Sequence, residues 1–496
     1  MQHSIKIWLW GKEIGSLMWR EERHNSYFVY HPDYLNNPIE PFPLMAPKKG
    51  AINRTFHSDT ARMYQRLPAF LADSLPDDWG NALFEQWRID QGLSMSQVTP
   101  LEKLMFIGSR GMGALEFVPD AQMNPRAEKI DIAALAQLAQ KIFNDREKAV
   151  IEPNETITKK LLMLVGTSVG GRQPKALIAI HRETGEIRSG QIAELEGYDY
   201  HILKFGNATR SFAELEMTYY EMACMAGIHM MPSRLLTADG EKHFLTQRFD
   251  RENSQKWHLQ TLAAMNPDAD SYEQLLLVCR HLHLPDATGE EIFRRMVFNY
   301  LANNTDDHNK NFSFMLSPNG QWELTPAYDM TFIFNVGGYQ PQREHCLMMR
   351  GKLTDWSKED IMLFAEQNGI RNAEKIIGQV ATAIMQFRTI ATRHGVRQEW
   401  IGCVEECLMV HLREWGFVET KPDNNEWILH GGQSLTRVYL EQAYKGNIHL
   451  YATINGNTRR WVFRPSMPEY KLIMEMGITN VPQEMLCRWI EERLQS

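Results

Sequence analysis

The chain has 496 residues, 43% of them hydrophobic, and a formal net charge of −8 from 53 basic and 61 acidic side chains. This length predicts about three packed units, and the negative charge excludes an overall basic field for nonspecific nucleic-acid binding. Six cysteines are too sparse for a disulfide framework. The sequence has no run of about eighteen apolar residues, so we expect a cytoplasmic protein that neither spans nor binds a membrane.

Residues 1–145 predict an amino-terminal α+β module. Strand-like runs alternate with turns rich in proline and glycine, as in HPDYLNNPIEPFPLMAPKKG, and helical patterns appear near residues 58–73 and 131–145.

A glycine-containing loop follows in LLMLVGTSVGGRQPKALIAI, residues 161–180, where two apolar runs flank Gly166, Gly170 and Gly171. Glycines at such positions permit close approach of the backbone to a phosphate group. Their spacing fits neither GxxxxGK[ST] nor GxGxxG, so an ordinary hairpin turn stays an alternative.

The run DYHILKFGN, residues 199–207, alternates like a strand with Lys204 in its middle, and a predicted helix bearing Glu216 follows. A lysine on such a strand can neutralise nucleotide phosphates, and a helical glutamate can hold it in place by a charge-assisted hydrogen bond. A surface ion pair is the alternative explanation of these two residues.

The run KHFLTQRFDR, residues 242–251, predicts a strand with a polar exit. In a two-lobed kinase the connecting strand presents its backbone to adenine, and Gln247, Arg248 and Phe249 would fall there. An ordinary strand with Phe249 in the core is the alternative.

Residues 271–400 are mostly helical by pattern, and Ile292, Phe293, Met296, Val297 and Tyr300 recur at helical spacing on one apolar face. We expect this face to belong to the core and to position the loop that follows.

That loop, NNTDDHNKNFSF, carries Asp306 and Asn311, and a predicted hairpin then leads to Asp329. Phosphoryl transfer needs a carboxylate to orient the attacking hydroxyl, and an amide oxygen and a second carboxylate to hold magnesium. Asp306, Asn311 and Asp329 supply these groups in the order that protein kinases use, and the first two have the spacing DxxxxN. Asp307 adds a second carboxylate, and we expect the two like charges to repel unless magnesium or Lys310 offsets them.

The last hundred residues predict a small α+β extension with paired strands on either side of Asn455–Asn457. Arg459, Arg460, Trp461 and Arg464 could form a surface for RNA or a partner protein, although solvated strand arginines beside a core tryptophan explain them as well. Our hypothesis is that this extension selects a substrate or partner.

Several motifs in fixed order resemble the HipA-type serine/threonine kinases, the toxins of bacterial toxin–antitoxin pairs. They are FLADSLPDDWG, FIGSRGMGALEF, SVGGRQPKA, HILKFG, ELEMTYYEMACMAGI, LTQRFDR, NNTDDHNKNFSF and LTPAYDM. The resemblance covers roughly residues 1–400. It implies an α+β, protein-kinase-like two-lobed fold with an amino-terminal module (1–145), an N-lobe (146–265) and a mostly helical C-lobe (266–400). The predicted carboxy-terminal α+β extension (401–496) lies beyond the resemblance.

The resemblance also implies roles for individual residues. Asp306 would be catalytic, Asn311 and Asp329 would hold Mg²⁺, and Glu216 would support Lys204. The implied ATP-binding residues are Gly170, Gly171, Gln173, Lys175, Lys204, Gln247, Phe249, His308, Lys310, Asn311, Tyr328 and Asp329. Family members often have an acid where this chain has Gln247, so the charge near adenine differs.

Regulation and partners follow from the same resemblance. Ser168 would be the site of autophosphorylation, and the added negative charge would repel nucleotide and switch the kinase off. The kinase would stop growth by phosphorylating a translation-linked protein such as an aminoacyl-tRNA synthetase. A helix-turn-helix HipB-like antitoxin would be the partner, and DNA would be reached only through it. A kinase-shaped scaffold that binds an antitoxin or regulator, with little or no catalysis, is the alternative.

Overall fold

The computed structural model describes residues 3–59, 61–94, 98–120, 130–144, 162, 173–191, 195–206, 211–252, 255–334, 344–417, 426–427, 435–442, 448–454, 457–467 and 470. The chain divides into two compact units, residues 1–415 and 416–496. Among the described residues, no helix is both long enough and apolar enough to cross a membrane.

The amino-terminal module is built on a sheet in the order β4-β3-β2-β1-β5. Its neighbouring strands are antiparallel, and apolar side chains alternate along β1 and β3 as a half-buried sheet requires. The strands are β1 Ser4–Leu9, β2 Lys12–Arg20, β3 Asn25–Tyr30, β4 Phe56–His57 and β5 Leu115–Val118.

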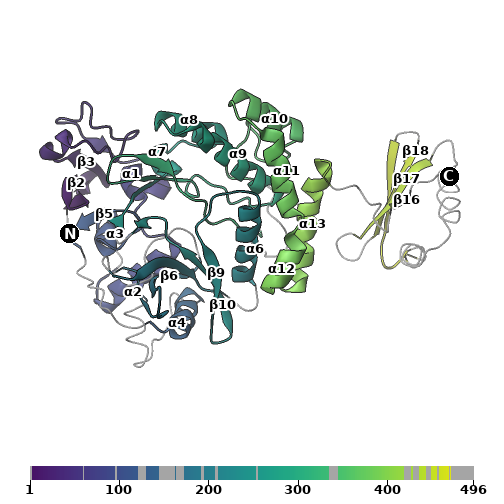
Figure 1. Ribbon diagram of the computed structural model, residues 1–496, viewed down its shortest axis with the longest axis horizontal. Coiled ribbons are helices and arrows are strands. Elements are labelled where there is room, and N and C mark those ends of the chain that lie inside the picture. Colours follow the sequence, from purple (N-terminus) through teal and green to yellow (C-terminus); the bar gives the residue numbers. More distant parts are fainter. Residues whose placement is uncertain are drawn as a thin grey trace. The chain divides into compact units, whose positions relative to one another are not determined.

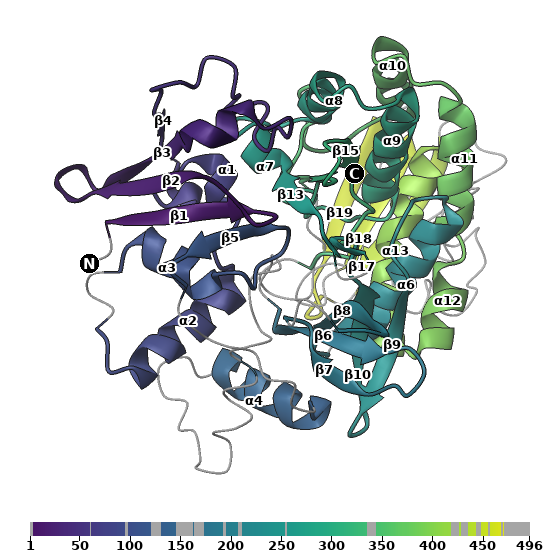
Figure 2. The same cartoon turned by 60° about the vertical axis from the view of Figure 1, so that its left-hand side comes forward.

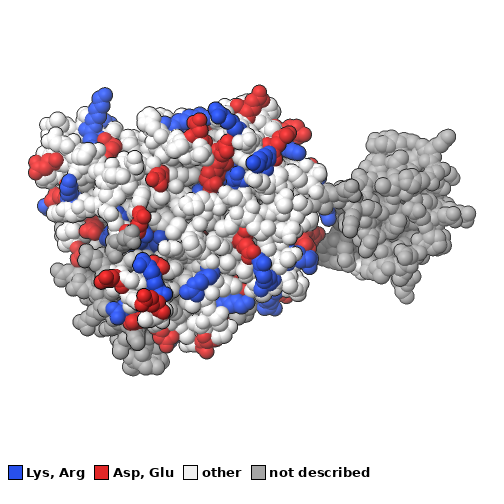
Figure 3. Space-filling view, in the orientation of Figure 1, with Lys and Arg blue, Asp and Glu red and all other residues white. Residues whose placement is uncertain are grey.

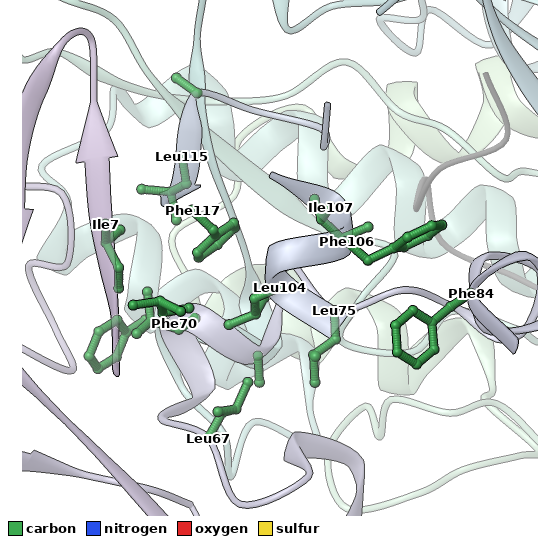
Figure 4. Packing of buried hydrophobic residues seen from close by; sticks show 14 of the residues in the cluster. Ile7, Leu67, Phe70, Leu75, Phe84, Leu104, Phe106, Ile107, Leu115 and Phe117 are labelled. Carbon is green, nitrogen blue, oxygen red and sulfur yellow. The ribbon is translucent and has the colours of Figure 1, made fainter. Parts of the chain in front are cut away.

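Helices pack beside this sheet and complete the core of the module (Figure 1). Figure 4 shows Leu67, Phe70 and Leu75 close to Leu104 and Phe117 in this core. The helices are η1 Glu21–Arg23, η2 Pro32–Asn36, η3 Arg62–Tyr64, α1 Ala69–Ala72, α2 Asp78–Asp90, α3 Pro100–Ile107 and α4 Ile132–Asn144. The sequence predicted the last of these within two residues at either end.

A second antiparallel sheet, in the order β7-β6-β8-β10-β9, forms the small lobe (Figure 2). Helix α6, Phe212–Met225, packs against β9 and β10. The strands are β6 Lys175–His181, β7 Ile187–Ser189, β8 Tyr198–Lys204, β9 Ser233–Ala238 and β10 Glu241–Gln247. The predicted strand with Lys204, the helix with Glu216 and the strand before Gln247 are therefore confirmed.

The large lobe is mostly helical. Helix α9 packs against α8, α11 and α13, and its predicted apolar face is buried throughout. The helices are α7 Leu262–Met265, α8 Tyr272–His281, α9 Asp286–Leu301, α10 Lys358–Gln367, α11 Ala373–Ile384, α12 Phe387–His394 and α13 Gln398–Glu414. Residue 401, where we expected the extension to begin, lies inside α13 and therefore inside the first unit.

Short strands frame the loop that contains Asp306. The sheet β13-β14-β15 includes the predicted hairpin, and β14 and β15 are paired shortly before Asp329. The bounds are β11 Arg251–Glu252, β12 Gln255–Lys256, β13 His258–Thr261, β14 Ser313–Leu316 and β15 Trp322–Leu324.

The amino-terminal module is joined to the small and large lobes by a buried ion cluster. Asp250 contacts the guanidinium groups of Arg248 and Arg251 and accepts a hydrogen bond from the backbone N–H of Gly113 at 2.7 Å. Gly113 has a φ of 78°, and a Cβ there would lie 3.2 Å from the nitrogen of Leu259, so both the conformation and the close approach favour glycine. Because Asp250 is fully buried, its charge is balanced by these partners rather than by water.

The carboxy-terminal unit contains an antiparallel sheet among its described residues, in the order β16-β17-β18-β19. The strands are β16 Glu426–Trp427, β17 Leu435–Gln442, β18 Ile448–Ile454 and β19 Asn457–Phe463. The predicted pairing of the last two strands is confirmed. Arg460 is exposed and Trp461 is half-buried. This burial fits both explanations of the strand, a binding surface and solvated arginines beside a packed tryptophan.

Candidate functional site

Lys204 at the end of β8 is the centre of the candidate site. Its ammonium lies 2.5 Å from Oε1 of Glu216 on α6 and also contacts Oδ1 of Asp329. Strand β8, helix α6 and the segment after β15 are far apart in the sequence, and Lys204 brings all three together. The predicted ion pair of Lys204 and Glu216 is present, and it lies in the interior rather than at the surface.

The charged groups of this cluster shift one another's pKa values. Burial opposes the charged form of Lys204, but the carboxylates of Asp329 and Glu216 outweigh it and raise the pKa of the ammonium. Burial also opposes ionisation of Asp329, and the positive charges of Lys204 and Lys175 lower the pKa of its carboxyl group below the usual value. For Glu216 burial prevails over Lys204, and its pKa is raised. Asp329 is therefore the more readily ionised carboxylate of the pair.

The backbone at Asp329 is unusual. Its φ of 53° lies in the left-handed region, which residues other than glycine rarely adopt. Such conformations persist where the surroundings fix them, and they concentrate at functional sites. The preceding Tyr328 helps to fix this turn, because its hydroxyl donates to the carbonyl of Lys310 at 2.8 Å and also contacts the hydroxyl of Ser313.

Asp306 lies in the loop that follows α9. Its side chain is 51% exposed and lies 3.8 Å from Nε2 of His308. The side-chain nitrogen of Asn311 donates to the backbone carbonyl of Asp306 at 2.7 Å, which closes the predicted DxxxxN segment on itself. Tyr328, which directly precedes Asp329, donates to the carbonyl of Lys310 in this loop, so Asp329 lies beside the loop.

Asp307 has a different environment from Asp306. Its side chain is completely buried and accepts hydrogen bonds from the hydroxyl of Tyr272 at 2.6 Å and the N–H of Cys346 at 2.7 Å. Nδ1 of His345 lies 3.0 Å from the same carboxylate. These three partners fix the Asp307 carboxylate in the interior, and Asp307 therefore anchors the loop.

In the connecting strand Gln247 and Phe249 are half-buried, whereas the side chain of Arg248 turns inward. The ring of Phe249 lies 5.7 Å from that of Tyr328, between the lobes. The guanidinium of Arg248 is fully buried and donates to both carboxylate oxygens of Asp250 at 2.8 Å. The backbone N–H of Arg248 donates to the carbonyl of Tyr200 at 2.8 Å, so only the Arg248 carbonyl could face a ligand.

The start of β6 lies beside Lys204. Gln173 donates to the carbonyl of Phe205 at 2.9 Å, and Lys175 is the cross-strand partner of Lys204. The Lys175 ammonium is buried, 3.4 Å from Oδ2 of Asp77 in the amino-terminal module. The other predicted phosphate-binding residues, Gly170 and Gly171, and the predicted modification site Ser168 lie outside the described residues.

The side chains present suit a hard divalent cation. Asp329 offers carboxylate oxygens and Asn311 an amide oxygen, and oxygen atoms are the ligands that Mg²⁺ takes. Within the described ranges, no three His, Cys, Asp or Glu side chains form a metal cluster.

Sequence reasoning missed the contributions of Asp77, Asp307 and His345 to this site. Asp77 belongs to FLADSLPDDWG, a motif that we noticed only as a resemblance. An acid directly before a helix is also the ordinary pattern of a helix cap, and Asp77 does cap α2 through the N–H of Gly80. Its contact with Lys175 depends on the tertiary structure, which no local pattern reveals.

Comparisons with known proteins agree with this architecture. A family model described as the HipA N-terminal domain matches residues 5–118, and one described as the HipA-like C-terminal domain matches residues 167–387. A protein named "Putative kinase" from Haemophilus influenzae is 29% identical over 290 residues, which are 50% of this chain and 82% of the relative. The serine/threonine-protein kinase toxin HipA of Shewanella oneidensis is 22% identical over 319 residues, 59% of this chain and 69% of the relative.

A solved structure from Shewanella oneidensis, the complex of HipA, HipB and operator DNA, contains a chain of similar fold. The TM-score is 0.59 at 18% sequence identity, and the match covers 83% of this chain and 97% of that chain. The α+β, kinase-like fold expected from the sequence is thereby confirmed.

Proposed function

Because the chain belongs to the HipA family of serine/threonine kinase toxins, we propose that it is an ATP-dependent protein serine/threonine kinase. One observation carries the proposal. Lys204, Glu216 and Asp329 meet beside the loop that contains Asp306, since Tyr328 next to Asp329 is hydrogen-bonded to Lys310 of that loop. A cation held by a helical glutamate, a carboxylate able to bind magnesium and an exposed carboxylate are the groups that phosphoryl transfer requires.

The nucleotide would lie between the lobes. Lys204 would contact its phosphates, with Gln173, Lys175, Gly170 and Gly171 nearby. Gln247 and Phe249 would frame adenine, with Tyr328 against the ring of Phe249. Lys310 would add positive charge, and His308 a ring nitrogen, from the loop that contains Asp306. Asn311 and Asp329 would hold Mg²⁺, which supplies charge neutralisation at the phosphates when it is bound.

Asp306 would act on the hydroxyl group of the protein substrate. Its exposed carboxylate can accept the hydroxyl proton as the oxygen forms a bond to the γ-phosphorus and the bond to ADP breaks. Asp307 cannot share this role, because its carboxylate is enclosed by Tyr272, His345 and Cys346.

We also propose how the kinase is switched off, which protein it phosphorylates and which protein binds it. Ser168 would receive a phosphate from ATP, and the new charge would repel nucleotide and switch the kinase off. The target would be a translation-linked protein, such as an aminoacyl-tRNA synthetase, and its phosphorylation would stop growth. The kinase would act in the cytoplasm. The Shewanella complex contains HipB and operator DNA, and a HipB-like antitoxin is accordingly our proposed partner for this chain.

The carboxy-terminal unit would contribute to the choice of target or partner. Residues 416–496 lie beyond both matched family domains, so this unit is a feature of the chain that the family models do not cover.

The test is phosphate transfer by the full-length protein. We expect Mg²⁺-dependent ATP binding by calorimetry and transfer of labelled phosphate to serine or threonine, both on the chain itself and on purified aminoacyl-tRNA synthetases. Asp306→Asn should bind ATP but transfer phosphate far more slowly than the wild type. If the wild type binds a HipB-like antitoxin but neither binds ATP nor transfers phosphate, the protein is a kinase-shaped scaffold and the proposal is wrong.

A further inference from the structure

A short stretch of the amino-terminal module, Asp73–Trp79, is bonded to both kinase lobes. On one side the indole N–H of Trp79 donates to the carbonyl of Lys175 at 2.9 Å, and the carboxylate of Asp77 lies 3.4 Å from the Lys175 ammonium. On the other side Asp73 accepts hydrogen bonds from the N–H and the hydroxyl of Thr261, at 2.7 and 2.8 Å. Lys175 begins the small-lobe strand β6, and Thr261 ends β13 of the large lobe.

The large-lobe contact fixes this stretch relative to the catalytic loop. The two residues after Thr261 donate backbone hydrogen bonds to that loop, Leu262 to the carbonyl of Phe312 at 2.7 Å and Ala263 to that of Asn309 at 3.1 Å. Lys310 of the loop lies near Asp73, since its charge partly offsets the effect of burial, which raises the pKa of that carboxyl group. Asp73 thus ties the amino-terminal module to the backbone that supports Asp306 and Asn311.

The stretch itself cannot shift easily. Leu75 belongs to the core of the amino-terminal module, next to Leu104 (Figure 4). Trp79 is fully buried, and the hydroxyl of Tyr64 donates to the carbonyl of Ala263 at 3.1 Å. Because both flanks are held by packing and hydrogen bonds, the carboxylate of Asp77 has a defined position relative to both lobes.

The small-lobe contact acts on a lysine inside the site. Lys175 and Lys204 are direct cross-strand partners, so their side chains leave the same face of the sheet. The Lys175 side chain is only 2% exposed, and that of Asp77 is 10% exposed. Two ammonium groups at such positions repel each other, and each is attracted by the carboxylates of Glu216 and Asp329. The carboxylate of Asp77 supplies Lys175 with a counter-ion of its own, separate from that pair.

We propose that Asp77 is a positioning residue of the phosphotransfer site, which holds the Lys175 ammonium beside Lys204 so that both can contact the nucleotide phosphates. The inference rests on the proposed function. It makes the amino-terminal module part of the catalytic unit, because one of its carboxylates sets the position of a small-lobe lysine. Without that charge, Lys175 is drawn toward Glu216 and Asp329 and competes with Lys204 and the metal for their carboxylates.

The chain offers a variant that separates this role from helix capping. The substitution Asp77→Asn keeps the cap of α2, because asparagine caps helices as well as aspartate does, but it leaves no charge for Lys175. The experiment compares full-length wild type, Asp77→Asn, Asp77→Ala and the control Asp78→Asn, which removes an exposed charge from the first turn of the same helix. Each protein is tested for Mg²⁺-ATP affinity by calorimetry, for KM and kcat, and for thermal unfolding.

We expect Asp77→Asn to weaken ATP binding and raise KM about tenfold, with a smaller change in kcat and an unchanged unfolding temperature. Asp77→Ala should show the same loss of affinity together with a lower unfolding temperature, and Asp78→Asn should behave as wild type. In a Lys175→Gln background, Asp77→Asn should have little further effect on affinity, because the two residues act as one unit.

Two failures are distinguishable. Wild-type protein that binds no ATP would contradict the proposed function itself. Wild-type protein that binds ATP, with Asp77→Asn binding equally well or more tightly, would overturn the role of Asp77 and leave the kinase proposal intact. An effect of Asp77→Asn that persists in full in the Lys175→Gln background would also overturn it.

Discussion

Lys204 on strand β8 contacts the carboxylate of Asp329, although 125 residues separate the two along the chain. Glu216 contacts the same ammonium from helix α6. This joint contact shows that the small-lobe helix, the small-lobe sheet and the segment after β15 are engaged with one another. A phosphotransfer site needs these elements in contact, so that the lysine can bind the nucleotide phosphates and the aspartate can bind the metal.

The hold on Lys204 should depend on the charge of Glu216. Glu216→Gln keeps a hydrogen-bonding side chain but removes one of the two carboxylates beside the ammonium, so Lys204 would shift toward Asp329. We expect kcat/KM for ATP to fall about tenfold, which corresponds to about 1.4 kcal/mol. Glu214→Gln on the same helix is the matched control, because Glu214 is near Lys242 rather than the site. Equal kinetics for both variants would contradict the role of Glu216.

Substitutions of Asp306 and Asp329 should affect different steps, catalysis in the first case and ATP binding in the second. Asp306→Asn removes the proton acceptor and should lower kcat by about 10² to 10⁴-fold while ATP affinity is kept. Asp329→Asn removes a proposed metal ligand and should weaken Mg²⁺-dependent ATP binding itself. Calorimetry with and without EDTA measures this difference, since chelation should abolish tight binding by the wild type and change little in Asp329→Asn. Loss of ATP binding in Asp306→Asn would argue against the assigned roles.

The adjacent residues Asp306 and Asp307 should differ in their effect on stability. Asp307 is buried and bonded to Tyr272, His345 and Cys346, so Asp307→Asn leaves donors poorly paired. We expect the free energy of unfolding to fall by about 2 to 4 kcal/mol. Asp306→Asn, at an exposed position, should change it by less than about 0.5 kcal/mol. Chemical denaturation of the two variants side by side provides the measurement, and equal stabilities would show that Asp307 is no anchor.

Stability should depend on pH through His258, which is fully buried in β13 and lies 3.1 Å from the carbonyl of Pro41. Burial lowers the pKa of its imidazole to about 4. The unfolded chain therefore binds the extra proton first. Stability is fully present above the unfolded pKa of about 6.5 and falls as the pH drops from there to about 4, by about 3 kcal/mol.

His258→Gln keeps a donor for Pro41 but does not titrate, so its stability should fall less than that of the wild type over this range. Other groups titrate in both proteins, and the difference between the two unfolding curves isolates His258. His3→Gln, at an exposed histidine, is the control. A variant curve parallel to that of the wild type from about pH 6.5 to about 4 would contradict the prediction.

Removal of the carboxy-terminal unit should separate chemistry from target choice. The cut belongs after Gly416, because Trp415 donates to the carbonyl of Trp356 at 3.0 Å and stacks on Tyr300, and α13 buries Ile401, Val404 and Leu408 in the first unit. We expect residues 1–416 to bind ATP and autophosphorylate like the full chain but to select targets or partners differently. Unchanged phosphorylation targets and antitoxin binding would exclude a selecting role for this unit.

Local patterns in the sequence were sufficient for much of the fold and the site. The period of α9, the alternation around Lys204 and the hairpin before Asp329 reflect burial that each element imposes on its own residues. The candidate site was predicted from the DxxxxN spacing of Asp306 and Asn311 and from Lys204 and Glu216 on neighbouring elements. These residues were informative because the chemistry of a side chain is fixed by its residue type.

Long-range contacts were beyond such patterns. The burial of Asp307 depends on Tyr272, His345 and Cys346, which are about 35 to 39 residues away, and the contact of Asp77 with Lys175 spans 98 residues and joins two modules. Charged residues of this kind look like surface residues in a sequence, since a carboxylate is ordinarily exposed. The face shown in Figure 3 carries interspersed charges of both signs on its described residues, and composition alone could not separate those from the buried ones.

The most direct test of phosphotransfer is intact-mass and peptide mass spectrometry of the full-length protein after incubation with ATP and Mg²⁺. Wild type, Asp306→Ala and Ser168→Ala are compared. We predict that the wild type gains a phosphate that maps to Ser168 and that neither variant gains it at that position. A wild type that gains no phosphate and binds no nucleotide, or an Asp306→Ala protein that is phosphorylated as fully as the wild type, would contradict the account.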